Sequence, residues 1–132
     1  MTPTRFSKRR GGRALVRHRG VMNDTERAYA LFLELCVRDD TLVAWDFEPE
    51  RLRIGDGAYY TPDFRLVYPD GVVEFVEVKG RGRGRGGADI AHCEEAAAVR
   101  LKAAAERHWM YRFALVFPAR GGGWARRVFA EV

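Results

Sequence analysis

Apolar residues recur at helical spacing after Asn23, and this pattern predicts a helix that ends at about Arg38. The sequence N-D-T-E at its start offers a capping side chain with an acid three residues later, which is a common helix start. One apolar stripe of this helix consists of Ala28, Leu31, Phe32, Leu35 and Cys36. We therefore expect an amphipathic first helix.

Glu26 is the unusual residue of this helix. Ala30, Leu33 and Val37 follow it at the spacing that puts side chains on one side of a helix. The carboxylate therefore lies on a side that is otherwise apolar, which is an unusual position for a surface acid.

Shorter apolar runs predict strands in the rest of the chain. Val43–Glu48 alternates between apolar and polar residues and should end at Pro49, and Arg51–Ile54 either continues that strand or forms a separate one. The later elements are a hairpin within Tyr60–Gly80, a helix over about Asp89–Arg107, a strand over Met110–Phe117 and a short strand around Trp124–Phe129.

The order of these elements indicates an α/β fold. The chain reads helix, three strands, helix, strand, with a small C-terminal addition. The second hairpin strand, the long helix and the next strand form a crossover unit, and such units normally join parallel strands. We expect a mixed sheet flanked by helices, in a single domain over residues 23–132 that follows an arm over residues 1–22.

The hairpin has a turn that fixes which residues face each other. Tyr68–Gly71 reads Y-P-D-G, which suits a type I turn followed by a left-handed glycine. Tyr68 then faces Val72, and Asp63 lies across from Glu77, with β-carbons about 4.5–5.5 Å apart. Lys79 shares this face because alternate strand residues point the same way. A slip of one residue would separate the two acids.

Two carboxylates this close repel each other unless a cation lies between them. Oxygen ligands at this separation suit Mg²⁺ or Mn²⁺, which also bind substrate phosphates. A lysine beside the metal can orient or deprotonate an attacking water, or neutralise charge at phosphorus. The spacing is also compatible with a simple cross-strand ion pair of Lys79 with Asp63 or Glu77. Against this, Val73 and Phe75 make the lower part of the face apolar.

The positive charge of the chain is concentrated in two segments. The net charge is +5, yet residues 1–19 hold seven basic residues and no acid, and the remaining chain holds 16 basic and 18 acidic residues. The second segment is the run GRGRGRGG, Gly80–Gly87. Such cationic, Gly-rich segments are suited to phosphate contact. The candidate nucleic-acid-binding residues are Arg9, Arg10, Arg13, Arg17, Arg81, Arg83, Arg85 and Lys102.

Composition excludes some other classes. At 47% hydrophobic and 12% aromatic residues the chain can bury a core and is not a disordered polypeptide. It has no apolar run of the roughly 18 residues that a membrane span needs and no secretory signal, so we expect a cytoplasmic protein with no membrane partner.

Pro62-Asp63, followed by Glu77-Val78-Lys79, resembles the PD-(D/E)xK motif of the restriction-endonuclease-like nuclease superfamily. In that superfamily the first acid and the ExK lie on neighbouring hairpin strands, and the core has the same order of elements. The resemblance covers about residues 23–118 and implies a restriction-endonuclease-like core.

More narrowly, M-N-x-T-E, Y-T-P-D-F and E-V-K-G look like a family of small phage-associated nucleases, some of which resolve DNA junctions. By this resemblance Asp63 and Glu77 would be metal ligands, Lys79 the catalytic lysine, and Glu26 the acid that completes the metal shell. The longer Arg-Gly run after Lys79 departs from the family pattern.

The function implied is that of a Mg²⁺-dependent endonuclease that hydrolyses DNA, with Mn²⁺ able to substitute, in a bacterial or phage-infected cell. Duplex and branched DNA are both candidate substrates, and resolving a four-way junction would require a symmetric homodimer. Two alternatives stay open: an exonuclease or end-processing enzyme with the same site, and a non-catalytic nucleic-acid-binding module.

Overall fold

The computed structural model describes residues 20–80 and 87–129. The helices of this part are α1 (Asp24–Arg38) and α2 (Gly87–Arg107), and the strands are β1 (Ala44–Phe47), β2 (Leu52–Gly55), β3 (Ala58–Tyr60), β4 (Phe64–Val67), β5 (Val73–Val78), β6 (Arg112–Pro118) and β7 (Trp124–Phe129). Five strands form one sheet in the order β1-β4-β5-β6-β7. Only the β5–β6 pair is parallel among the pairs of that sheet. The predicted α/β class and mixed sheet are confirmed.

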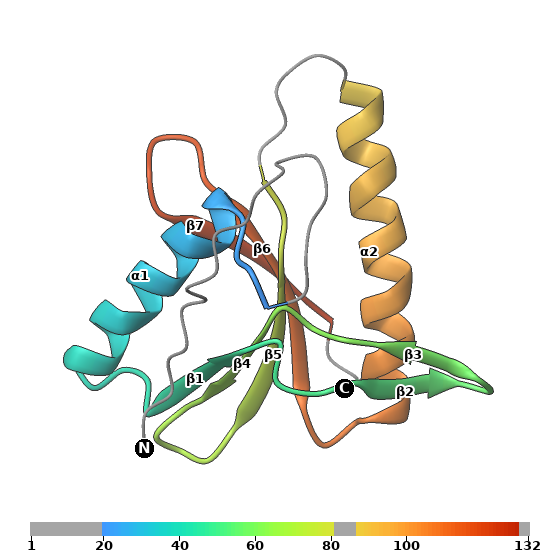
Figure 1. Ribbon diagram of the computed structural model, residues 1–132, viewed down its shortest axis with the longest axis horizontal. Coiled ribbons are helices and arrows are strands. Elements are labelled where there is room, and N and C mark those ends of the chain that lie inside the picture. Colours follow the sequence, from blue (N-terminus) through green and yellow to red (C-terminus); the bar gives the residue numbers. More distant parts are fainter. Residues whose placement is uncertain (1–19, 81–86, 130–132) are drawn as a thin grey trace.

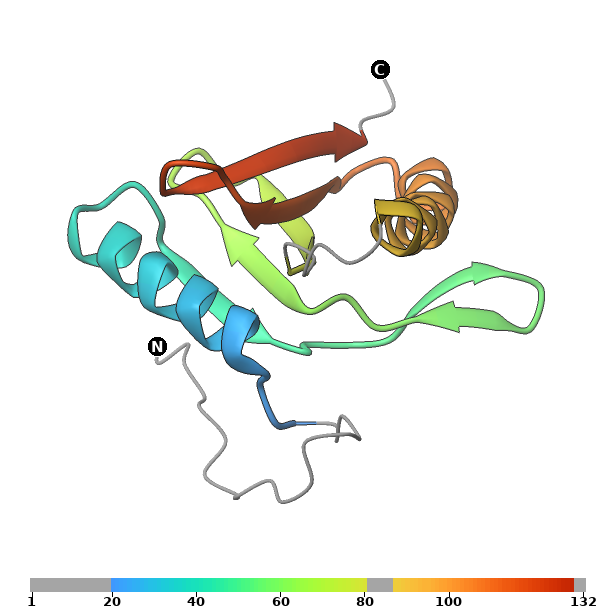
Figure 2. The ribbon, with the colours of Figure 1, turned by 90° about the horizontal axis from the view of Figure 1, so that it is seen from above.

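The sheet separates the two helices, as Figure 2 shows from above. Because successive strand residues point to opposite faces, each strand contributes to two cores. Val76 of β5 packs with Tyr29 and Leu33 of α1, whereas Phe75 packs with Leu101 of α2. No helix in the described part of the chain is long and apolar enough to cross a membrane.

α1 begins where predicted and buries the side that carries Glu26. Asn23 is the N-cap, and Glu26 completes a capping box with it. Leu31 and Leu35 of the predicted stripe are 61% and 59% exposed, whereas the buried positions are Glu26, Tyr29, Ala30 and Leu33. The helix has apolar residues on two sides, and its sequence does not reveal which of them the sheet covers.

Five strands instead of three precede α2. Arg51–Ile54 corresponds to a separate strand, β2, and its partner β3 is absent from the predicted elements because three residues are too few for alternation to be recognised. The two strands form a small sheet that projects from the body (Figure 1). Leu52 and Tyr60 anchor it under α2, with Phe75 in the same core.

The register of the β4–β5 hairpin is the predicted one. Phe64 pairs with Val76 at one end, and Val67 pairs with Val73 next to the turn. The turn itself is closed by a hydrogen bond of 2.8 Å from the Gly71 nitrogen to the Tyr68 carbonyl oxygen. Gly71 has a φ of 94°, the left-handed conformation that favours glycine.

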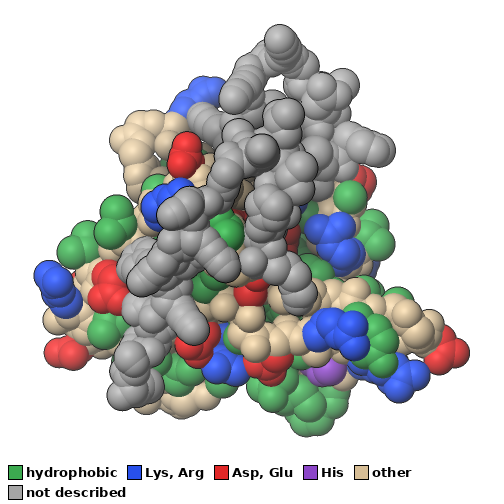
Figure 3. Space-filling model, in the orientation of Figure 1, with side chains coloured by type: hydrophobic (Ala, Val, Ile, Leu, Met, Phe, Trp, Pro, Cys, Tyr) green, Lys and Arg blue, Asp and Glu red, His purple; other side chains and the backbone are tan. Residues whose placement is uncertain are grey.

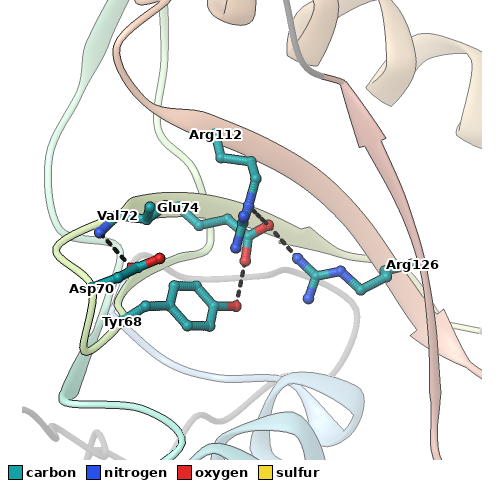
Figure 4. Close-up of polar contacts among 6 residues, drawn as sticks. All are labelled: Tyr68, Asp70, Val72, Glu74, Arg112 and Arg126. Carbon is teal, nitrogen blue, oxygen red and sulfur yellow. Dashed lines mark hydrogen bonds and ion pairs between the residues drawn. The ribbon is translucent and has the colours of Figure 1, made fainter.

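A buried ion cluster joins three strands on the α1 face of the sheet (Figure 4). Glu74 of β5 is fully buried and accepts hydrogen bonds from Tyr68 Oη at 2.6 Å, from Arg112 Nε at 3.0 Å, and from Arg126. The arginines come from β6 and β7. Burial alone would lower the pKa of Arg126, but bonding and attraction to Glu74 raise it above its usual value. The cluster therefore ties the two last strands to β5.

We expect Glu74→Gln to lower the free energy of unfolding by about 2–3 kcal/mol, because it removes a buried charge that accepts two charge-assisted hydrogen bonds. Urea denaturation measures the change. Glu50→Gln is the matched control, since the exposed Glu50 carboxylate also pairs with an arginine, Arg65, at 2.6 Å. That exposed pair should contribute less than about 1 kcal/mol. Equal losses in the two variants would contradict a structural role for the cluster.

Candidate active site

Two predicted site residues, Asp63 and Glu77, lie next to each other at one end of the β4–β5 hairpin. Continued by one residue beyond Phe64, the observed register puts Asp63 opposite Glu77. The Val78 nitrogen donates a hydrogen bond of 2.9 Å to Asp63 Oδ2, which holds the aspartate against β5. Asp63 is 6% exposed and Glu77 is 7% exposed. Two carboxylates thus share one nearly closed region on the α2 face of the sheet.

Glu77 is surrounded by donors from three elements. The Tyr60 hydroxyl, at the end of β3, donates a hydrogen bond of 2.6 Å to Glu77 Oε1. Lys79 Nζ lies 3.5 Å from Glu77 Oε2, so the lysine shares the face as predicted. A second cation, Arg100 of α2, has Nη2 at 3.8 Å from the same oxygen. Two positive groups therefore balance the charge of the carboxylate, and one neutral hydroxyl donates a hydrogen bond to it.

Tyr60 links the projecting hairpin to the acids. Burial raises the pKa of its hydroxyl well above the usual value, and the negative charges of Glu77 and Asp63 raise it further. The phenol thus stays protonated as a hydrogen-bond donor to Glu77. Tyr60 is a site residue that the sequence did not mark, because its contact with Glu77 depends on the unpredicted strand β3.

Glu26 approaches from the other side of the sheet. Its Oε1 accepts a hydrogen bond of 2.9 Å from the Asn23 nitrogen, as the third residue of the capping box. The neighbouring Thr25 hydroxyl lies 3.2 Å from the position that a β-carbon would take at Gly80, immediately after Lys79. The first turn of α1 therefore adjoins the end of β5. Glu26 is 2% exposed, which agrees with its place on an otherwise apolar side of the helix.

The arrangement provides oxygen ligands without a complete metal cage. Within residues 20–80 and 87–129, no three Asp, Glu, His or Cys side chains are grouped so that they could hold a metal ion. Asp63 and Glu77 still fit Mg²⁺, because this cation takes one or two carboxylates and keeps several waters. The assignment of Glu26 as a third ligand stays a prediction.

Of the predicted nucleic-acid-binding residues, Lys102 lies away from Asp63 and Glu77, and the others lie outside the described residues. Arg9, Arg10, Arg13, Arg17, Arg81, Arg83 and Arg85 lie outside the described residues. Lys102 lines a groove of about 440 Å³ with Val99 and Arg127, between α2 and β7. Two residues along a helix correspond to about 200° of rotation, so Lys102 points away from the side of α2 that carries Arg100. The sequence did not show that Lys102 lies away from Asp63 and Glu77.

The raised pKa of Tyr60 predicts a loss of stability at high pH. An unfolded tyrosine has a pKa of about 10, so the unfolded chain loses this proton first and stability falls as the pH rises above that value. Replacing Tyr60 with Phe should make the fall between about pH 9 and pH 11 shallower, as measured by urea midpoints. Tyr59→Phe is the control, because Tyr59 is 47% exposed. Parallel pH curves for wild type and Tyr60→Phe would contradict the prediction.

No known family matches the sequence, and no curated protein matches it. The resemblance to the nuclease superfamily is thus carried by a short motif and its setting. A functional assignment has to come from the chemistry of the site.

Proposed function

We propose that this chain is a Mg²⁺-dependent endonuclease that hydrolyses DNA phosphodiester bonds on a restriction-endonuclease-like core. The observation that carries the proposal is the buried pair Asp63 and Glu77 with Lys79 on the same face. A pair of acids in a closed region costs stability, since desolvation disfavours their charged forms and they repel each other. A fold that maintains such a pair beside a lysine is equipped to bind a cation and an anionic substrate.

In this proposal each residue has a separate role. Asp63 and Glu77 would hold the metal, with Glu26 as a third ligand from the first turn of α1. The metal would lower the pKa of a bound water and neutralise charge on the phosphate. Lys79 would stabilise the negative charge that builds up on the phosphate oxygens while water adds to phosphorus and the bond to the leaving oxygen breaks. Tyr60 would keep Glu77 in one orientation through its hydrogen bond of 2.6 Å.

DNA is the proposed substrate because the basic segments favour a polyanion. The arm over residues 1–19 carries seven basic residues and no acid. On the body of the molecule, acidic and basic side chains are interspersed over the described part of the face drawn in Figure 3. Phosphate contacts of the arm and of the Arg-Gly run would therefore supply affinity without reading sequence.

Lys79→Ala tests the chemistry. Labelled four-way junctions, flaps, nicked duplex and linear duplex are incubated with wild type or variant in Mg²⁺, in Mn²⁺ or in EDTA. We expect wild type to cut in both metals and not in EDTA, and the variant to be about 10²–10³-fold slower, because a charge-stabilising group at the reacting phosphate is lost. Cleavage progressing from free ends would favour the exonuclease alternative over internal cutting.

The matched control is Arg38→Ala, which removes an exposed positive charge from the last turn of α1 and should leave the cleavage rate unchanged. If wild type binds these DNAs but cuts none in either metal, the chain is a binding module and the enzyme proposal fails. Equal rates for wild type and Lys79→Ala would remove Lys79 from the mechanism without removing the activity.

Glu26→Gln separates the two roles of the buried acid of α1. Glutamine also serves as the third residue of a capping box, so we expect the variant to keep the start of α1 and to fold. Loss of a carboxylate ligand should raise the Mg²⁺ concentration for half-maximal cleavage at least roughly tenfold, equivalent to about 1.4 kcal/mol of metal binding. An unchanged Mg²⁺ dependence of cleavage would mean that Glu26 caps α1 and does not bind the metal.

A further inference from the structure

Arg100 brings a second cation to the acidic pair. Its guanidinium reaches from α2 to within 3.8 Å of Glu77 Oε2 and lies over the ring of Tyr60, with its central carbon 5.5 Å from the ring centroid. The Arg100 side chain is 39% exposed. It therefore lies at the border between the closed acidic region and solvent. The sequence motif did not indicate this residue, because it lies on a different element from the acids.

The contacts of Arg100 leave its hydrogen-bonding capacity unused within the described residues. The distance of 3.8 Å is an ion pair but is too long for a hydrogen bond. By contrast, Arg112 donates to Glu74 at 3.0 Å, and Arg65 donates to Glu50 at 2.6 Å and to Asp46 at 2.7 Å. Those guanidinium groups stabilise the fold through charge-assisted hydrogen bonds, whereas Arg100 donates no hydrogen bond to another described residue.

Because Lys79 already pairs with Glu77, a purely structural role explains Arg100 less well. The lysine ammonium is the nearer cation, at 3.5 Å from the same oxygen of Glu77. A second positive charge at 3.8 Å therefore adds to a neutralisation that Lys79 already provides. The cation–π contact with Tyr60, with the central carbon 5.5 Å from the ring centroid, uses none of the N–H donors of Arg100, so they remain able to bind an anion.

We propose that Arg100 is a phosphate-binding residue of the site, which grips a backbone phosphate of the bound nucleic acid through two parallel N–H···O bonds. The inference rests on the proposed nuclease function, since it places the phosphodiester next to Asp63 and Glu77. The guanidinium lies over the Tyr60 ring, and Glu77 attracts it towards the acids. Arginine suits this role better than lysine, because its rigid fork matches two phosphate oxygens.

The test measures binding and cleavage separately on the full chain. Binding of a fluorescein-labelled DNA duplex and four-way junction is measured by anisotropy in EDTA at several salt concentrations, and cleavage is measured in Mg²⁺. We expect Arg100→Gln to weaken binding severalfold and to reduce the slope of log K against log[salt] by about 0.9, the value for one lost phosphate contact. A purely structural arginine would change stability but not this slope.

Two further variants sharpen the result. Arg100→Lys keeps the positive charge but cannot donate two parallel hydrogen bonds to one phosphate. Its salt slope should therefore equal that of wild type, while its kcat/KM should be lower than that of wild type. Arg38→Gln removes the same charge from the last turn of α1, at the other end of that helix from Thr25, and should alter neither quantity. Should Arg100→Gln fail to fold, Arg100→Lys still decides the matter: kcat/KM and affinity equal to wild type would overturn the bidentate contact.

The outcomes distinguish this inference from the proposed function. If wild type cuts DNA and Arg100→Gln has the same affinity, salt slope and kcat/KM, Arg100 does not bind phosphate, and the nuclease proposal stands. If wild type binds but does not cut, and Arg100→Gln still lowers the salt slope, the phosphate contact stands and the catalytic proposal fails. Absence of DNA binding by wild type would overturn both.

Discussion

The candidate site depends on the register of one hairpin. The turn at Tyr68–Gly71 fixes β4 and β5 so that Phe64 pairs with Val76, and Asp63 then lies beside Glu77. A slip of one residue would move the aspartate to the face that packs on α1 and leave the glutamate alone under α2. The left-handed Gly71 therefore influences the geometry of the candidate site at the far end of the hairpin, because the position of every side chain along β4 follows from the turn.

The second constraint is that buried carboxylates need partners, and these partners connect the remaining elements to the site. Asp63 is held by a backbone nitrogen of β5, and Glu77 is held by Tyr60 of the projecting hairpin and by Arg100 of α2. Charge burial costs several kcal/mol per group when it is not compensated. The Tyr60 hydroxyl thus ties the small β2–β3 sheet to Glu77, while α2 is positioned mainly by the apolar core that it shares with Tyr60 and Phe75.

The parts of the site that sequence could predict are local. The capping box at Asn23 and the register of the β4–β5 hairpin follow from residues a few positions apart, and the structure has both. The contacts of Tyr60 and Arg100 with Glu77 join residues 17 and 23 positions apart, through elements whose packing no local pattern fixes. For the same reason the sequence left the buried side of α1 open, since only the sheet selects between its two apolar sides.

β5 contains two buried glutamates that the fold uses in opposite ways. Glu74 lies near the start of the strand. It accepts hydrogen bonds from Tyr68, Arg112 and Arg126. Glu77 lies near the carboxyl end of the strand, where its two cations stay beyond hydrogen-bonding distance at 3.5 and 3.8 Å. In open α/β sheets, ligand sites occur at this end of the strands. Glu74 thus stabilises the sheet, whereas the longer cation contacts of Glu77 are compatible with the metal and phosphate binding proposed above.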